Sequence, residues 1–110
     1  MGLLSRVLGM FSTRGKATAL FKRGVDKAEH RDLEGAIADY TSVIDLKGAP
    51  EDVIAMALFN RALAYSRERD DTKATADLDR VLSMSGATQH VIDAAHEKLH
   101  RMKRRATKSV

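Results

Sequence analysis

The sequence predicts an all-α fold in which two helical hairpins are followed by a C-terminal capping helix. Residues 17–49 align with residues 55–87 after a shift of 38 positions, with 13 identical pairs among 33, and a period of this length is typical of stacked helical units. Apolar residues recur at steps of three and four within each copy, which is the period of a helix. A single proline in 110 residues also favours helix over strand.

Each copy divides into two apolar stretches that a short polar turn separates. The apolar positions of the first copy are Ala17, Leu20, Phe21, Gly24, Val25 and Ala28, then Leu33, Ala36, Ile37, Tyr40, Val43 and Ile44. Those of the second copy are Ala57, Leu58, Ala62, Leu63 and Tyr65, then Ala74, Leu78, Val81 and Leu82. The sequences HRD and RERDD interrupt the helical period, so each copy is expected to form a hairpin of two helices.

Five residues mark the expected ends of these helices. Asp32 and Asp71 are predicted N-caps, because a carboxylate there accepts hydrogen bonds from unpaired amide groups. Gly48 and Gly86 stand where a helix commonly ends in the left-handed conformation. Pro50 is expected at or near the first turn of the next helix, where its missing N–H costs little.

A last helix is predicted over residues 88–105, with one apolar stripe and a charged opposite face. The stripe consists of Val91, Ile92, Ala95, Leu99 and Met102. Such a helix shields the end of a stack from water. The expected organisation is an amphipathic N-terminal segment over residues 1–12, a helical repeat domain over 13–105 and a basic flexible tail over 106–110.

Small and large residues occupy matched positions in the two copies. These positions are Gly24, Ala36, Tyr40 and Val43 in the first copy and Ala62, Ala74, Leu78 and Val81 in the second. The pattern resembles the tetratricopeptide repeat, although the period here is 38 residues and no proline ends the unit. The resemblance covers residues 13–105 and implies a fragment of an α-solenoid, in which small side chains let helices approach closely.

By this resemblance, the first helix of each unit lines an inner groove that binds a peptide or another protein. The residues implied for partner binding are Phe21, Lys22, Phe59, Asn60, Leu63, Arg67, Lys98 and Arg101. Asn60 matches a position where some family members hold a peptide backbone, and Lys98 offers charge to a carboxylate. Because Phe21 and Val25 occupy the other positions of that carboxylate clamp, the clamp is incomplete. The implied function is a non-enzymatic adaptor or scaffold, with core packing as the alternative for Phe21 and Phe59.

The charge distribution leaves two other functions open. Residues 1–25 carry +5 and residues 98–110 carry +6, so residues 26–97 carry −7 within the total of +4. The basic ends favour a peripheral membrane or polyanion-binding protein, although no aromatic residues interleave with the C-terminal cations and nucleic acid is not the expected partner. The apolar residues of segment 1–11 also suit peripheral contact with a membrane, packing on the domain itself or self-assembly into a structural oligomer.

The residue inventory predicts neither catalysis nor a bound cofactor. No cysteine is present, which removes thiolate nucleophiles and zinc–thiolate sites and fits a cytoplasmic protein. His96 and His100 have a metal-ligand spacing but fall on the polar face of the last predicted helix, so no metal site is expected. Arg6 interrupts the one apolar run near the start, which argues against a membrane span and a secretory signal, and Arg6 also breaks the myristoylation pattern that begins at Gly2.

Overall fold

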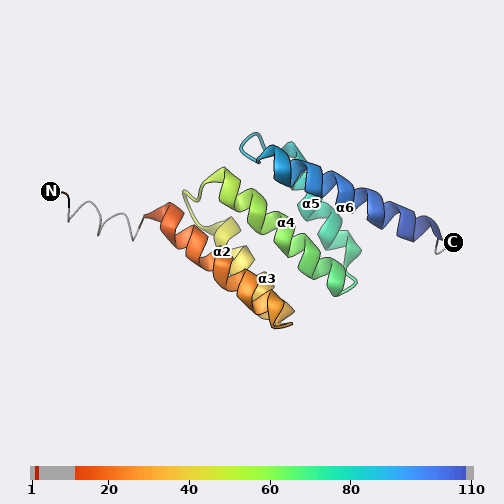
Figure 1. Cartoon of the computed structure of the whole chain (residues 1–110), viewed down its shortest axis with the longest axis horizontal. Coiled ribbons are helices and arrows are strands. Elements are labelled where there is room, and N and C mark those ends of the chain that lie inside the picture. Colours follow the sequence, from red (N-terminus) through yellow and green to blue (C-terminus); the bar gives the residue numbers. More distant parts are fainter. Residues whose placement is uncertain (1, 3–11, 109–110) are drawn as a thin grey trace.

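The computed structural model describes residue 2 and residues 12–108, and this part of the chain contains helices but no strand. The helices are α2 (Thr13–Glu29), α3 (Leu33–Asp45), α4 (Glu51–Arg67), α5 (Asp71–Ser83) and α6 (Gln89–Lys108). Their order along the chain is shown in Figure 1. The all-α prediction is therefore confirmed for the described residues.

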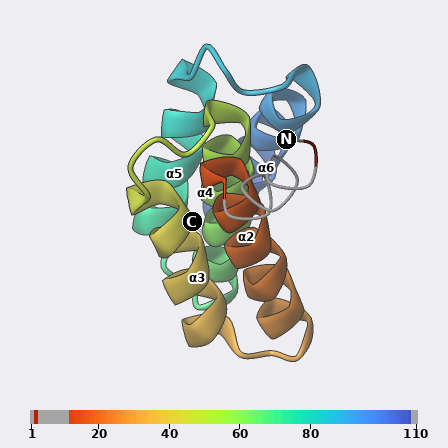
Figure 2. The ribbon, with the colours of Figure 1, turned by 90° about the vertical axis from the view of Figure 1, so that its left-hand side faces the viewer.

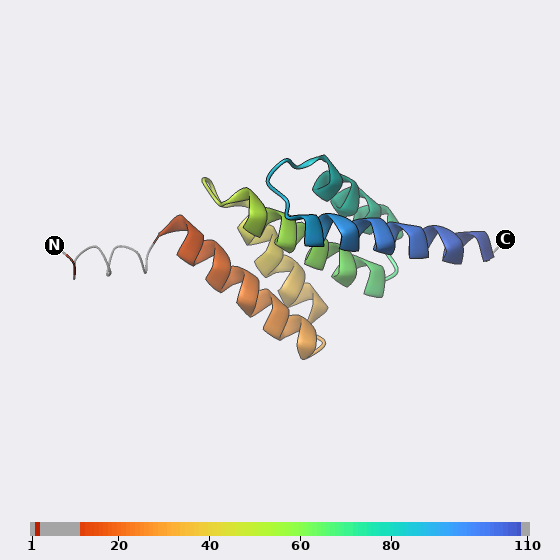
Figure 3. The same ribbon diagram turned by 45° about the horizontal axis from the view of Figure 1, so that its top comes forward.

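The helices form two layers. Helices α2, α4 and α6 lie in one layer, and α3 and α5 lie in the other, as Figures 1 and 2 show from two directions. Each helix packs against the next one in the chain, and α4 also contacts α2 and α6 within its own layer. Figure 3 shows α6 extending away from the two hairpins toward the C-terminus. The layer of α2, α4 and α6 is the one to which the predicted partner-binding residues belong.

Small residues form the closest contacts between the helices. Gly24, Ala36, Ala62 and Ala74 are all buried, as their matched positions predict. A Cβ atom added at Gly24 would lie 2.6 Å from Cε1 of Tyr40, which is too close for unstrained packing. The glycine therefore makes room on α2 for the tyrosine ring of α3.

Two apolar clusters make up the core. One lies around the first hairpin and the beginning of α4, with Ala17, Ala36, Tyr40, Val43, Val53 and Ala57 buried. The other joins α4, α5 and α6 and contains Ala55, Leu58, Ala62, Ala74, Leu78, Val81, Val91, Ala95 and Met102. Because α4 contributes to both clusters, it couples the first hairpin to the rest of the domain.

The N-caps repeat at the second helix of each hairpin. The carboxylate of Asp32 accepts a hydrogen bond from the Gly35 amide at 3.0 Å, and Asp70 accepts one from the Lys73 amide at 3.1 Å. The N-cap prediction for Asp32 is confirmed, whereas the prediction for Asp71 is wrong. Asp70 is the counterpart of Asp32 after a shift of 38 residues, so the repeat places the cap one residue earlier and makes Asp71 the first helical residue.

The left-handed positions differ in part from the prediction. Gly48 has a φ of 80°, as expected, but the prediction for Gly86 is wrong, since no positive φ occurs there. After α5 the chain leaves through an extended Met84, and Gly86 packs closely against the Glu51 side chain instead. The unexpected left-handed residues are Arg31 and Arg69, with φ values of 65° and 63°.

These two arginines end α2 and α4 in the same way. The Asp32 amide donates to the Lys27 carbonyl at 2.8 Å, and the Asp70 amide donates to the Tyr65 carbonyl at 2.9 Å. Such bonds satisfy carbonyl groups that the helix end leaves unpaired, and they require a left-handed residue just before the donor. The hairpin turns are thus two copies of one motif.

Helix α6 carries the predicted apolar stripe. Val91, Ala95 and Met102 are buried, and Ile92 and Leu99 are half-buried. The helix continues to Lys108, so residues 106–108 are helical instead of part of the flexible tail that the sequence predicted. The Thr107 hydroxyl donates to the Lys103 carbonyl at 2.9 Å in this extension.

The expectations for the first segment of the chain are not addressed by the structure. Residues 1 and 3–11, to which the predictions of domain packing, self-assembly and membrane contact refer, lie outside the described residues. Among the helices that the structure describes, none has the length and apolar character needed to cross a bilayer.

Candidate partner-binding surface

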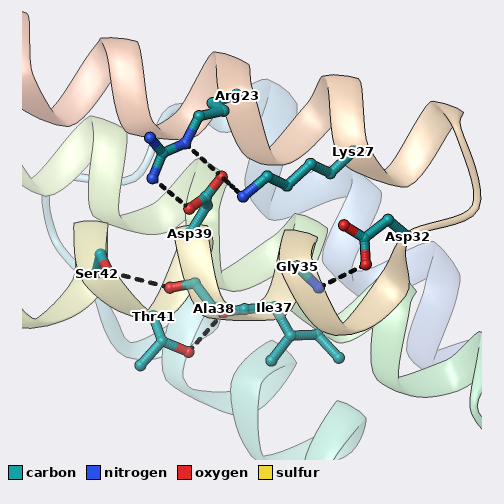
Figure 4. A network of polar contacts seen from close by, with 9 residues as sticks. All are labelled: Arg23, Lys27, Asp32, Gly35, Ile37, Ala38, Asp39, Thr41 and Ser42. Carbon is teal, nitrogen blue, oxygen red and sulfur yellow. Dashed lines mark hydrogen bonds and ion pairs between the residues drawn. The ribbon is translucent and has the colours of Figure 1, made fainter.

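A buried carboxylate fixes each hairpin internally. Asp39 on α3 is only 3% exposed, and its two oxygens accept hydrogen bonds from Nε and Nη2 of Arg23 at 2.9 and 2.8 Å. Lys27 Nζ lies 3.1 Å from the same carboxylate, and Figure 4 shows both cations beside Asp39. The Arg23 hydrogen bond is the main cause that holds the pKa of Asp39 below its usual value, with Lys27 adding to it against the opposing effect of burial.

The second hairpin repeats this ion pair and extends it. Arg61 on α4 donates to both oxygens of Asp77 at 2.8 Å, and Asp77 is 6% exposed. Arg61 also donates to the Thr41 hydroxyl on α3 at 3.0 Å. Because one guanidinium group contacts both α3 and α5, it fixes α4 relative to the two helices of the other layer.

A pocket of about 170 Å³ opens between α2 and α4, and we call it the α2–α4 pocket. Its lining residues are Val25, Ala28, Glu29, Leu33, Tyr40, Asn60, Leu63, Ala64 and Arg67. Most of these side chains are apolar, with Glu29 and Arg67 as the charged members. The pocket therefore combines an apolar wall with charged groups, which is common in ligand-binding sites.

A second hollow of about 200 Å³ lies between α4 and α6. It is lined by Met56, Phe59, Asn60, His90, Val91 and Ala94. Asn60 belongs to both this hollow and the α2–α4 pocket, and its side-chain amide donates to the Met56 carbonyl at 2.9 Å. One donor of the amide group is thus used within α4, and the group lies between the two hollows.

Arginine side chains border the α2–α4 pocket and continue from it toward α6. Arg67 also lines a hollow with Arg31 and another with Arg69 and Arg105. Arg105 in turn lines a hollow with three more cations. We call the basic side chains of these hollows the basic rim: Arg31, Arg67, Arg69, Arg101, Arg104, Arg105 and Lys108. The carboxylates among the lining residues are Glu29 and Asp71, so cations dominate this surface.

Lys98 is half-buried beside the basic rim. Burial is the main cause that lowers the pKa of its ammonium group, and the nearby Arg105 and Arg101 lower the pKa further. Asp71 opposes the shift, and it also forms an ion pair with Arg105 at 3.3 Å. Positive charge is therefore concentrated on this side of α6 beyond what Asp71 offsets.

The structure brings together some of the sequence-predicted site residues. Asn60, Leu63 and Arg67 share the α2–α4 pocket, Phe59 lines the hollow beside α6, and Arg101 belongs to the basic rim. Phe21 lies elsewhere, with its ring centroid 5.9 Å from that of Tyr40, and Lys22 is exposed on α2. Phe21 thus takes part in packing between α2 and α3, the alternative that its helical spacing left open.

Sequence reasoning missed the part of the surface that the hairpin turns supply. Leu33 begins α3 yet lines the α2–α4 pocket, and Arg31 and Arg69 belong to the basic rim. Arg31 and Arg69 are identical residues after the shift of 38 positions, as are the neighbouring Asp32 and Asp70. The shared Arg-Asp pair in both turns was the signal that marked them.

Comparisons with known proteins found no match to this chain. The chain matches no protein-family model, no curated protein and no solved structure. Among the described residues, no group of three or more His, Cys, Asp and Glu side chains is arranged to hold a metal ion.

Proposed function

We propose that this protein is a non-enzymatic adaptor that binds a peptide or protein partner on the face formed by α2, α4 and α6. The tetratricopeptide-like arrangement implied by the sequence belongs to the same proposal, as does a cytoplasmic location. In this arrangement the two hairpins and α6 form a short α-solenoid whose first helices present the groove.

The observation that carries this proposal is the composition of the α2–α4 pocket. Two hairpins contribute to it, and Leu63, Asn60 and Arg67 converge there from one helix. An apolar wall gives a partner side chain a place to be buried, while an amide and a guanidinium group supply directional contacts. The Arg23–Asp39 and Arg61–Asp77 pairs, in which the carboxylates are buried, hold the helices that shape the pocket.

The proposal is tested by recovering partners from the native source with wild-type protein and with the triple variant Asn60→Ala, Arg67→Ala, Lys98→Ala. We expect a specific partner that the wild type retains and the variant loses. Raised ionic strength should also release this partner from the wild type, because charged contacts contribute to its binding. The control is Arg80→Ala, which removes an exposed charge from α5 in the other layer. Equal recovery by the wild type and the triple variant would contradict the proposal.

One alternative retains support from a specific observation. The C-terminal half of α6 exposes Arg101, Arg104, Arg105 and Lys108 around one hollow, which favours contact with a polyanion. Binding of anionic vesicles or of an oligonucleotide that is lost on removal of residues 103–110 would favour this alternative.

Self-assembly through residues 1–11 stays a prediction. Light scattering of the protein with and without residues 1–11 can test it.

A further inference from the structure

The apolar wall of the α2–α4 pocket ends at Arg67. Val25, Ala28, Leu33 and Leu63 form that wall, and Arg67 lines both the pocket and the two neighbouring hollows of the basic rim. A ligand that enters the pocket therefore passes directly from apolar contacts to a row of cations. Such a surface complements a partner that carries an apolar side chain next to carboxylates.

The hairpin turns place arginines where glycine would fit more easily. Arg31 and Arg69 both adopt left-handed backbone conformations, with φ values of 65° and 63°, and such a conformation costs a residue with a Cβ about 1–2 kcal/mol. Both side chains line hollows beside Arg67. The hydrogen bonds that end α2 and α4 hold both residues in this conformation, and the arginine side chain in each turn extends the row of cations.

Within the proposed adaptor function, on which this inference rests, we propose that the partner is an acidic peptide. An apolar side chain of this peptide occupies the α2–α4 pocket, and its carboxylates pair with Arg67 and with the cations of the basic rim toward α6. Glu29 lines the pocket and the hollow of Arg31 together with Arg67, so the carboxylates are placed toward Arg69 and Arg105, in the hollows that Glu29 does not line.

The chemistry of the surface favours a peptide over a nucleic acid. Single-stranded nucleic acids are bound largely by stacking of bases on exposed aromatic rings. Among the described residues, no aromatic side chain lines the three hollows that contain the basic rim. Tyr40 lines the α2–α4 pocket but is only 1% exposed, so its ring offers no platform for a base.

The proposal is tested by selecting a displayed library of random peptides on the immobilised full-length protein. A parallel selection uses the double variant Leu63→Ala, Arg67→Glu to remove peptides that bind elsewhere. We expect the peptides specific to the wild type to combine Asp or Glu with Leu, Ile, Met or Phe. Their binding is then measured by fluorescence anisotropy with synthetic labelled copies.

A charge exchange separates direct pairing from effects on folding. Arg67→Glu is expected to lower the affinity for an enriched acidic peptide by about tenfold or more. A copy of the peptide with Lys in place of the critical Glu should recover affinity for that variant alone. Arg80→Glu makes the same charge change on α5 and is expected to leave binding unchanged. Recovery by the Lys peptide cannot arise from an unfolded variant.

The possible outcomes distinguish this inference from the proposed function. Peptides that need Leu63 but are neutral or basic and ignore Arg67→Glu would overturn the acidic-partner inference and leave the adaptor function standing. Failure to enrich any peptide over the double variant would overturn the acidic-peptide inference, whereas the adaptor function is overturned only if the wild type and the triple variant recover the same proteins from the native source. If oligo(dT) displaces the peptide while replacement of its apolar residue by Ser changes nothing, the surface is a polyanion site and the inference is wrong.

Discussion

At the scale of single residues, two buried carboxylates explain much of how the helices are held. Asp39 and Asp77 would be costly to bury alone, but each accepts two hydrogen bonds from an arginine that lies 16 positions earlier in the chain. The two pairs differ in their surroundings, because the Arg23 side chain is 61% exposed and the Arg61 side chain is 16% exposed. Their contributions to stability should therefore differ as well.

We expect Arg61→Ala to destabilise the fold by about 3 kcal/mol, because it leaves the Asp77 charge buried without its partner. The substitution also removes the bond to Thr41 on α3. Arg23→Ala should have a smaller effect, since Lys27 remains beside Asp39 and water reaches the site. Urea unfolding of both variants, monitored by circular dichroism, gives the two losses of stability. Equal losses would show that burial does not distinguish the pairs.

Asp39 should make stability depend on pH in the acidic range. Its pKa is lower in the folded state than the value of about 3.9 expected for the unfolded chain. Its contribution is therefore fully present above the unfolded pKa and is lost as the pH falls through the folded pKa. We expect Asp39→Asn to be less stable than the wild type at neutral pH and the difference to shrink below about pH 4.

Chemical unfolding at a series of pH values measures this difference. A residual acid dependence should remain in Asp39→Asn, because the Arg14 hydrogen bond likewise lowers the pKa of Asp52. Asp52→Asn is thus the matched control for a more exposed ion pair. A constant gap between Asp39→Asn and the wild type from neutral to strongly acidic pH would contradict the assignment.

At the scale of helices, the two hairpins use different pairs of residues at one contact. Gly24 faces Tyr40 in the first hairpin, and Ala62 and Leu78 occupy the same positions in the second. Gly24→Ala should be destabilising despite the better helix propensity of alanine, because the new Cβ would lie 2.6 Å from the tyrosine ring. Tyr40→Leu alone should also be destabilising, because it leaves a cavity beside glycine.

The double variant Gly24→Ala, Tyr40→Leu reproduces the second hairpin's contact in the first. We expect it to be more stable than the sum of the single effects predicts, with a favourable coupling of about 1 kcal/mol or more. Thermal and urea unfolding of the four proteins in this cycle give the coupling. Additive effects would show that the two residues contribute to stability independently of each other.

The left-handed backbone conformation at the end of α4 should lower the stability of the fold. Arg69→Gly should raise the free energy of unfolding by about 0.5 kcal/mol, since relief of the left-handed strain exceeds the extra entropy of glycine in the unfolded chain. Arg80→Gly, within α5, should instead lower it by about 1 kcal/mol. A shift of the urea midpoint in opposite directions for the two variants, at unchanged slope, is the expected result. A loss of stability in Arg69→Gly would show that its side chain contributes more than the strain costs.

Helix positions could be predicted from this sequence because the repeat shows the same apolar pattern twice. The helix ends were harder to predict, because they depend on hydrogen bonds that no periodicity records. The sequence predicts Asp71 as a cap where Asp70 serves, and comparison with Asp32 in the first copy gives the observed residue. Comparison of the copies does not help at Gly86, because its counterpart Gly48 is left-handed and Gly86 is not.

The candidate site was predictable only in part for the same reason. Asn60, Leu63 and Arg67 lie on one face of a helix and could be placed from the sequence alone. Arg31 reaches the same surface from the turn and Leu33 from the first turn of α3, and their positions depend on how α2 and α3 cross. The sequence leaves both a groove position and core packing open for Phe21, because helical spacing does not say which apolar face a neighbour covers. Its ring contacts Tyr40, and it does not line the α2–α4 pocket.

At the scale of the whole molecule, α6 is polar at positions where its counterpart α4 is apolar. Leu58 and Ala62 on α4 are buried in the cluster that includes Ala74 and Leu78 of α5. After a shift of 38 residues, their counterparts on α6 are His96 and His100, which are exposed. The face that binds a following helix in the second unit is thus presented to water in the third.

Restoring an apolar face on α6 should cause self-association. The double variant His96→Leu, His100→Ala gives α6 the residues that α4 uses to bind α5, and an uncovered apolar patch of this kind favours contact with other copies. We expect the mass of the double variant, measured by light scattering, to increase with protein concentration and to exceed that of the wild type at the same concentration. Gln89→Leu, whose counterpart in α4 is the exposed Glu51, should leave the mass unchanged. If the double variant and the wild type have the same mass at every concentration, the two histidines are not what keeps this face of α6 from self-association, and the other charged side chains of α6 are sufficient to prevent it.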